Sequence, residues 1–242
     1  MYSFGKKINN SKVLGTYLFT DIVGSSKLWK KYKNKMFLAL KKHNQLIYKV
    51  AKKYDGLIVK TIGDAFYIAF HEKKGKKPSF IRAIRFALKI QKQLAKKPIF
   101  LQGSGSRSQN GRIKLRIGMC YGKAFKQYEK FQGKKMVDFY GAVINTASRM
   151  ESKVAKQGEV VIAFHENSKK NYIAIIEKEK DIRKDWCVKI KHYKKTCKDV
   201  PKFRKRSGRF LQGYSCLNEK ILHGVGQTKA YIFTPNSNGK RH

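Results

Sequence analysis

Residues 14–26 read LGTYLFTDIVGSS. The first part of this stretch is rich in β-branched and aromatic residues, a composition that predicts a short buried strand. The strand ends at Asp21, and a Gly-Ser-Ser turn follows in which Ser25 or Ser26 can cap a helix. Apolar residues then recur every fourth position over residues 28–40, so we expect an amphipathic helix that packs against the strand.

The next stretch with a clear pattern is residues 57–70, which read LIVKTIGDAFYIAF. Two apolar runs flank Gly63-Asp64, which predicts two strands joined by a tight hairpin turn. The remaining expected elements are a helix over 79–94, a strand over 113–120, a helix over 142–154, a strand over 160–164 and a closing strand over 231–233. This order predicts α/β or α+β sheet layers with helices on one face.

Residues 168–212 differ from the rest of the chain, because they are rich in lysine and show no strong period. We interpret them as a basic insertion before the last strand. The predicted organisation is an N-terminal tail (1–12), a core (13–167), the insertion (168–212), the end of the core (213–234) and a C-terminal tail (235–242).

The chain has 242 residues, which fits one domain, and its formal net charge is +41. Such a charge favours an acidic partner: a nucleotide, a nucleic acid or an anionic membrane surface. A solvated lysine-rich surface is the plainer interpretation, also for the densest basic cluster at 202–209. No apolar run is long enough to predict a transmembrane helix.

The cysteines show no paired spacing, which is typical of a protein of the reducing cytoplasm. Two interpretations stay open for the late part of the chain, where cysteine and histidine gather: free thiols or a zinc site. The residues concerned are Cys187, His192, Cys197 and Cys216.

Acidic residues are scarce, since residues 1–150 contain only six. Asp21 at a strand end and Asp64 in a turn could converge on one or two Mg²⁺ ions, which bind oxygen ligands. Taken singly, Asp21 also fits a helix cap and Asp64 an ordinary turn. The amides that open the first helix predict an anion site for a polyphosphate. They belong to Val23, Gly24, Ser25 and Ser26.

Three motifs occur in order along the chain: FTDIVGS (19–25), KTIGDAF (60–66) and DFYGAVINTASRME (138–151). Together they resemble the catalytic domain of class III nucleotide cyclases, the adenylyl and guanylyl cyclases. The resemblance covers about residues 13–164 and resumes at 221–233. It implies an α+β fold with a ferredoxin-like βαββαβ core, an antiparallel-rich sheet and helices on one face.

The resemblance also implies roles for individual residues. Asp21, Asp64 and the Ile22 carbonyl would hold two Mg²⁺ ions, for which Mn²⁺ can substitute. Lys60 and Asp138 would recognise adenine, since lysine can donate to N1 and aspartate can accept from the N6 amino group. The remaining implied residues are Asn145 and Arg149, which act on the transition state and share a helix face, and His223, which stands where the family has a phosphate-binding lysine.

The activity implied by the resemblance is conversion of ATP to 3′,5′-cyclic AMP and pyrophosphate at a homodimer interface. Asp21 and Asp64 of one subunit would meet Lys60, Asp138, Asn145 and Arg149 of the other, which makes two shared sites. Three alternatives stay open. They are a guanylate or mixed-specificity cyclase, a basic nucleic-acid-binding protein on a cyclase fold, and a cyclase docked on an anionic membrane surface.

Overall fold

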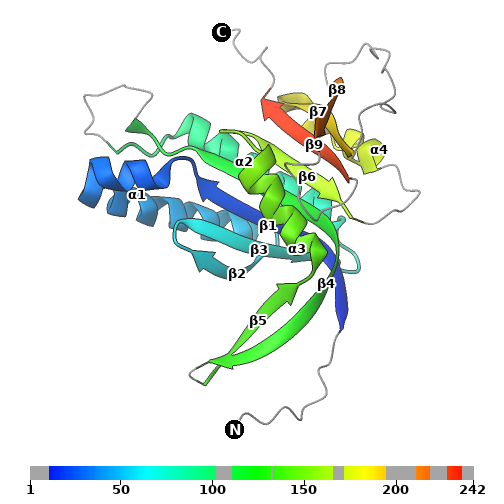
Figure 1. Cartoon of the computed structure of the whole chain (residues 1–242), viewed down its shortest axis with the longest axis horizontal. Coiled ribbons are helices and arrows are strands. Elements are labelled where there is room, and N and C mark those ends of the chain that lie inside the picture. Colours follow the sequence, from blue (N-terminus) through cyan, green and yellow to red (C-terminus); the bar gives the residue numbers. More distant parts are fainter. Residues whose placement is uncertain are drawn as a thin grey trace.

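The computed structural model describes residues 11–101, 111–131, 133–165, 172–194, 211–218 and 228–235. They form one nine-stranded sheet with helices packed against it (Figure 1). The strands are β1 (Lys12–Ile22), β2 (Leu57–Ile62), β3 (Ala65–His71), β4 (Leu115–Phe131), β5 (Lys134–Tyr140), β6 (Val160–Phe164), β7 (Trp186–Lys194), β8 (Leu211–Asn218) and β9 (Thr228–Pro235). The helices are α1 (Ser25–Lys53), α2 (Ser79–Lys96), α3 (Ala142–Arg149), the π-helical turn η2 (Met150–Val154), α4 (Tyr172–Glu177) and α5 (Lys180–Asp185).

Strand β1 lies in the middle of the sheet, whose order is β2-β3-β1-β4-β6-β9-β7-β8, with β5 paired to the far half of β4. It pairs antiparallel with both β3 and β4, and Tyr17 stands opposite Ala69 on one side and Cys120 on the other. Most pairings are antiparallel, and β4–β6 and β7–β8 are parallel. The predicted α+β class with an antiparallel-rich sheet is therefore confirmed.

The helices cover both faces of the sheet, so the prediction that they lie on one face is wrong. Leu18 of β1 belongs to the core under α1 and α2. Its neighbour Tyr17 belongs to a second core, which α3 covers with Val143 and Ala147. Successive side chains of a strand point to opposite faces, and β1 is apolar at consecutive positions. Both faces therefore need a covering layer.

Helix α1 begins without the predicted serine cap. Gly24 is the N-cap, with a φ of 70°, and no side chain donates or accepts a capping hydrogen bond there. This left-handed conformation favours glycine. The preceding amide, that of Val23, donates to the Lys114 carbonyl oxygen at 2.9 Å and so ties the end of β1 to the approach to β4.

Part of the segment predicted as an insertion belongs to the main sheet. Strand β7 pairs antiparallel with β9, and Trp186, Val188 and Ile176 lie in the core under α1 and α2. Lysines alternate with the apolar residues of β7 and conceal its strand pattern in the sequence. Residues 166–171 and 195–210 lie outside the described residues.

No helix in the described part of the chain combines the length and the apolar character needed to cross a lipid bilayer.

Because His43 is buried, we expect the stability of the folded chain to depend on pH. It is fully buried on α1, its ring stands edge-on to Phe66 at 5.7 Å, and burial lowers its pKa to about 4. Unfolding restores an ordinary histidine, so the unfolded chain takes up the proton first as the pH falls. The neutral buried ring therefore contributes stability that is fully present above about pH 6.5 and is lost as the pH falls toward 4. The loss between pH 7.5 and pH 5 amounts to about 2 kcal/mol.

Urea unfolding of the parent and of His43→Met at both pH values measures this contribution. The variant should lose about 2 kcal/mol less than the parent over that pH range. An identical pH dependence in both proteins would contradict a neutral buried His43.

Candidate active site

Two aspartates meet where β1 ends. Asp21 is the penultimate residue of β1, and Asp64 lies in the turn between β2 and β3. The Ile22 amide donates to Asp64 Oδ2 at 3.2 Å, which holds the turn against the strand end. Burial raises the pKa of Asp64, and the nearby Asp21 charge raises it further. Hydrogen bonds from the Ile22 and Asp64 amides and from the Ser25 hydroxyl oppose this rise.

Arg116 and Glu151 complete this cluster, and neither is among the residues predicted from the sequence. Arg116, on β4, places Nη2 2.6 Å and Nε 3.1 Å from Asp21 Oδ2. Its Nε also lies 2.5 Å from Oε1 of Glu151, a buried residue of η2. Burial raises the pKa of Glu151 to about 7, the charges of Asp21 and Asp64 add to the rise, and Arg116 opposes it.

A signal for both residues is present in the sequence. Arg116 is a charged residue inside an otherwise apolar strand (LRIGM, 115–119), and Glu151 comes directly after the 150 residues in which acids are scarce. A charge within an apolar element needs a partner when the element is buried. What the sequence does not contain is the identity of that partner.

The cluster fits a divalent cation. Two carboxylates and the Ile22 carbonyl are hard oxygen donors, and the mutual repulsion of Asp21 and Asp64 calls for a positive charge between them. Arg116 supplies that charge in the described structure. Among the described residues no group of three or more His, Cys, Asp or Glu side chains forms a metal site of its own. A bound Mg²⁺ would therefore need further oxygen ligands, as it commonly takes from substrate phosphates.

One of the four amides predicted to bind an anion at the start of α1 is already hydrogen-bonded within the chain. The Val23 amide already donates to Lys114, so it is not available to a phosphate. The amides of Lys27 and Leu28 donate back to the Gly24 carbonyl. Ser25 and Ser26 open the helix, and the first amides of a helix have no intrahelical acceptor.

Lys60 and Asp138 form a second group. They are 78 residues apart in sequence, on β2 and β5, and the lysine Nζ is in direct ion-pair contact with Asp138 Oδ2. The Phe139 amide donates to the other carboxylate oxygen at 2.8 Å and so orients the aspartate. Lys60 Nζ also lies 5.9 Å from the centre of the Tyr67 ring. The structure thus brings together the two residues that the sequence analysis assigns to adenine recognition.

Asn145 and Arg149 form a third group on α3, with Asn145 exposed and Arg149 half-buried. Within the part of the chain that the structure describes, neither side chain has a hydrogen-bonding or ionic partner, and none of the three groups contacts another by such a bond. One chain therefore contributes three separate sets of functional side chains.

Two predictions fall wholly or partly outside the described residues. His223 lies outside them. Of the proposed zinc residues, Cys197 lies outside them, and His192 and Cys216 stand opposite each other in the pairing of β7 with β8. The zinc alternative stays a prediction.

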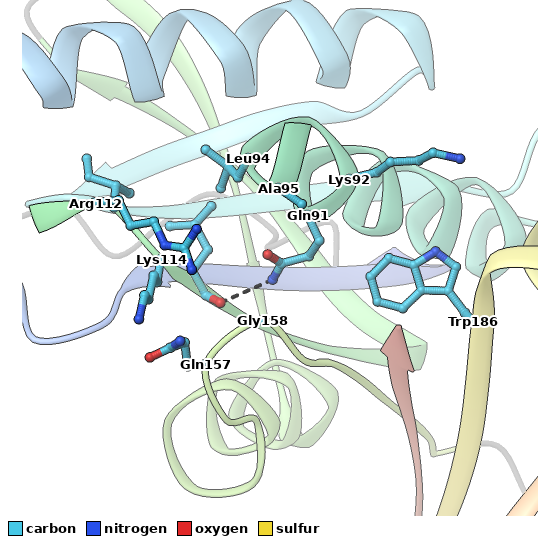
Figure 2. Close-up of a pocket in the computed structure, with 11 residues that line it drawn as sticks. Gln91, Lys92, Leu94, Ala95, Arg112, Lys114, Gln157, Gly158 and Trp186 are labelled. Carbon is cyan, nitrogen blue, oxygen red and sulfur yellow. Dashed lines mark hydrogen bonds between the residues drawn. The ribbon is translucent and has the colours of Figure 1, made fainter. Parts of the chain in front are cut away.

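A separate pocket of about 380 Å³ lies beside the C-terminal half of α2 (Figure 2). Gln91, Arg112, Lys114 and Trp186 are among its lining residues, and Gln91 Nε2 donates to the Leu115 carbonyl at 3.1 Å. None of the predicted site residues lines it, so it is distinct from the three groups above.

The chain is similar in sequence to known adenylate cyclases. The adenylate cyclase of Neurospora crassa is 29% identical over 154 residues, which are 59% of this chain and 6% of that protein. Receptor-type adenylate cyclase A of Leishmania donovani is 29% identical over 174 residues, which are 60% of this chain and 12% of that protein. The chain thus spans a small part of the length of these relatives.

Solved structures share the fold. The adenylyl cyclase CyaB from P. aeruginosa has a TM-score of 0.61 at 18% identity, over 94% of this chain and 96% of that one. The guanylate cyclase domain of RhGC from Catenaria anguillulae, in complex with GTP, has a TM-score of 0.60 at 22% identity, over 93% and 98%. The family model described as the adenylate and guanylate cyclase catalytic domain matches residues 10–195. Since this match covers more than half of the sequence, the chain belongs to the family of adenylate and guanylate cyclase catalytic domains.

Proposed function

We propose that this chain is an adenylate cyclase that converts ATP to 3′,5′-cyclic AMP and pyrophosphate. The observation that carries the proposal is the contact between Lys60 and Asp138. It presents one donor and one acceptor at a fixed spacing, from two strands that are distant in sequence. The curated relatives named above carry the name adenylate cyclase, and guanylate cyclase domains share the fold, so this pair is the feature that selects the base.

The pair complements adenine rather than guanine. Adenine has an acceptor at N1 and a donor at the exocyclic amino group, whereas guanine has a donor and a carbonyl at the corresponding positions. Lysine is a donor only, and an ionised aspartate is an acceptor only. The side chains of Lys60 and Asp138 are 43% and 15% exposed in the single chain, and a bound base would cover them. A mismatched base would then leave polar groups covered and unpaired, at a cost of about 1–3 kcal/mol per group.

The aspartate cluster would hold two Mg²⁺ ions, or Mn²⁺ in their place, through Asp21, Asp64 and the Ile22 carbonyl. When bound, such ions supply Lewis-acid activation of the ribose 3′-hydroxyl and neutralise charge on the triphosphate. The chain's own part is to hold these oxygens in place. A cation on Asp21 would replace the charge that Arg116 now supplies, and Arg116 would stay paired with Glu151.

The remaining groups would act on the phosphates. The Arg149 guanidinium has fork-like donors suited to phosphate oxygens, and Asn145 lies one helical turn away on the same face of α3. The amides of Gly24, Ser25 and Ser26 at the start of α1 would bind the polyphosphate, as would His223.

We infer a homodimer with two shared sites. Asp21 with Asp64, Lys60 with Asp138, and Asn145 with Arg149 are separate within the described part of one chain. A two-fold interface can bring the first pair of one subunit to the other two pairs of its partner, twice per dimer. An isolated monomer would then be inactive. The cysteines show no paired spacing in the sequence, which suits a reducing compartment, and we place the protein in the cytoplasm on that ground.

The test uses the purified chain with ATP or GTP and Mg²⁺ or Mn²⁺, with the products separated by chromatography. We expect cyclic AMP as the main product. In Lys60→Glu/Asp138→Cys, the ratio of GTP to ATP turnover should rise at least about 100-fold, because the donor and acceptor are exchanged for groups that match guanine.

The matched control is another ion pair, in which Lys77 Nζ lies 2.7 Å from Glu179 Oε1. Lys77→Glu/Glu179→Cys should keep the parent's preference for ATP. An exchange at Lys60 and Asp138 that leaves an active enzyme with unchanged preference would contradict their assignment. Cyclic GMP as the main product of the parent would favour a guanylate cyclase.

A further inference from the structure

Helix α1 has an unusually charged outer surface. Its 29 residues include ten lysines, all of them exposed, and no arginine or acidic residue. The opposite side of the helix is buried in the core through residues such as Met36, Ile47 and Val50. The helix bends at Lys33, where φ is 37° and the helical conformation is interrupted. Packing in the core therefore explains the residues on one side of α1. On the side that faces solvent, every charged residue is a cation.

Large apolar side chains stand in the middle of this cationic side. Phe37 is 66% exposed and Leu38 is 62% exposed. The half-buried Trp29 ring, on the other side of the bend, meets the Phe37 ring edge-on with centroids 6.5 Å apart. An open hollow between them is lined by these three residues, Lys33 and Asn34. Neither Phe37 nor Leu38 contributes to the core, so their exposure needs another reason.

We propose that this side of α1 docks on the surface of an anionic lipid bilayer. Phe37 and Leu38 would enter the boundary between headgroups and acyl chains, where aromatic and leucine side chains of interfacial helices lie. The lysines would pair with anionic headgroups, and their flexible stems can keep the ammonium groups at the headgroup level. The combination of exposed apolar side chains and surrounding lysines is what such a surface requires.

The charges and side-chain types on this side of α1 argue against two other partners, a second copy of the chain and a nucleic acid. A second copy of the same surface would bring lysines against lysines with no acid between them, in a chain of net charge +41, and like charges at an interface oppose association. A nucleic acid would use the lysines through its phosphates and could stack a base on Phe37, but it offers no apolar environment for the exposed Leu38. A lipid surface uses both kinds of side chain.

The docked orientation leaves the groups on α3 accessible. Helix α1 covers one face of the sheet, whereas α3, with Asn145 and Arg149, covers the other (Figure 1). The hairpin of β4 and β5 projects away from α1 in the same view. A bilayer under α1 would thus hold the chain with its α3 face turned outward. The docking does not depend on the proposed reaction.

Vesicle sedimentation of the full chain tests the proposal. We expect binding to phosphatidylcholine vesicles that contain phosphatidylserine, little binding to pure phosphatidylcholine, and a loss of at least about tenfold in affinity between 0.1 M and 0.5 M salt. Phe37→Ser/Leu38→Ser should weaken binding at least about tenfold at both salt concentrations. Lys41→Gln/Lys42→Gln should weaken it mainly at low salt.

The matched control changes exposed apolar residues on the β4–β5 hairpin, where Tyr128 is 55% and Met136 is 46% exposed. Tyr128→Ser/Met136→Ser should bind acidic vesicles as the parent does. Equal losses for the two double variants, or no loss for Phe37→Ser/Leu38→Ser, would overturn the proposal. Because the changed residues of α1 are exposed, circular dichroism should show an unchanged fold in each variant.

A second measurement locates the helix. In a Trp186→Phe background Trp29 is the only tryptophan, and acidic vesicles with brominated acyl chains should quench its fluorescence. Vesicles with ordinary acyl chains should not. Binding without this quenching would show that the chain docks through another surface. Loss of DNA binding or of a dimer in Phe37→Ser/Leu38→Ser, with vesicle binding intact, would assign the surface to a nucleic acid or to a second copy instead.

Discussion

Asp21→Asn is expected to lower the rate of the proposed cyclic AMP formation at least about 1000-fold, since it removes one of the two charged ligands expected to hold the metal ions. The variant keeps the size of the side chain but leaves Arg116 with Glu151 as its remaining carboxylate. The affinity for Mn²⁺, measured by titration calorimetry without nucleotide, should fall together with the rate. This second readout separates loss of the cation site from damage to later steps.

Asp55→Asn is the matched control for this change. Asp55 has a φ of 57°, which asparagine also tolerates, and it lies among lysines away from the proposed site. It should keep the parent's rate within about twofold, as surface changes away from a site usually do. A rate for Asp21→Asn close to that of the parent would contradict the assignment of Asp21 to the cation site.

The proposed shared interface predicts that two inactive variants, one of them Asp21→Asn, restore activity when they are mixed. Asp21→Asn and Asn145→Ala should each be inactive, and an equal mixture should recover up to about a quarter of the parent's activity. Half of randomly formed dimers are mixed, and each mixed dimer has one intact site of two. Dimers confirmed by sedimentation without any recovery would show that the site does not combine these residues from two subunits.

Gly118→Ala is expected to destabilise the fold by about 3 kcal/mol or more. A Cβ at this position on β4 would lie 1.9 Å from the Glu151 nitrogen and 2.4 Å from the Met150 carbonyl carbon. Both are backbone atoms of η2, so no change of rotamer relieves the clash. Either the strand or η2 must move, and with η2 would move Glu151 and the end of α3 that carries Arg149.

Urea unfolding compares this variant with Gly122→Ala on the same strand. There the added Cβ lies 2.9 Å from His165 Cβ and 3.2 Å from Val143 Cγ2, so the overlap is much smaller than at Gly118. We expect a loss of about 1 kcal/mol for Gly122→Ala. Gly118→Ala with stability close to that of the parent would contradict the close packing of η2 on β4.

The elements that could be predicted are those whose pattern is local. The strand before Asp21, the hairpin at Gly63-Asp64 and the helix over 79–94 each show their period within a few residues, and the structure confirms them as β1, β2–β3 and α2. Strands β5 and β7 were not predicted. Lysines alternate with the apolar residues of β7. In β5 two lysines come first and Asp138 interrupts the apolar residues that follow. Both strands are defined by pairing, with β9 and β4 respectively.

The helix arrangement could not be read from the same patterns. An apolar strand such as β1 predicts burial, but its sequence does not say which helix covers each face. The start of α1 shows a similar limit. Serines are good caps, yet the chain uses Gly24 in a left-handed conformation because β1 has to turn sharply into the helix after pairing through Val23.

For the candidate site, the sequence by itself determined the kinds of group and where each stands on its element. Asp21 ends a strand, Asp64 occupies a turn, and Asn145 and Arg149 share a helix face, all of which follow from spacing of a few residues. Tertiary structure alone decided the partners. Arg116 reaches Asp21 over 95 residues, and Lys60 reaches Asp138 over 78, because strand pairing and the return of β5 along β4 bring them together. Local patterns arise from the period of a single helix or strand, whereas contacts between distant charges depend on how the whole sheet is assembled.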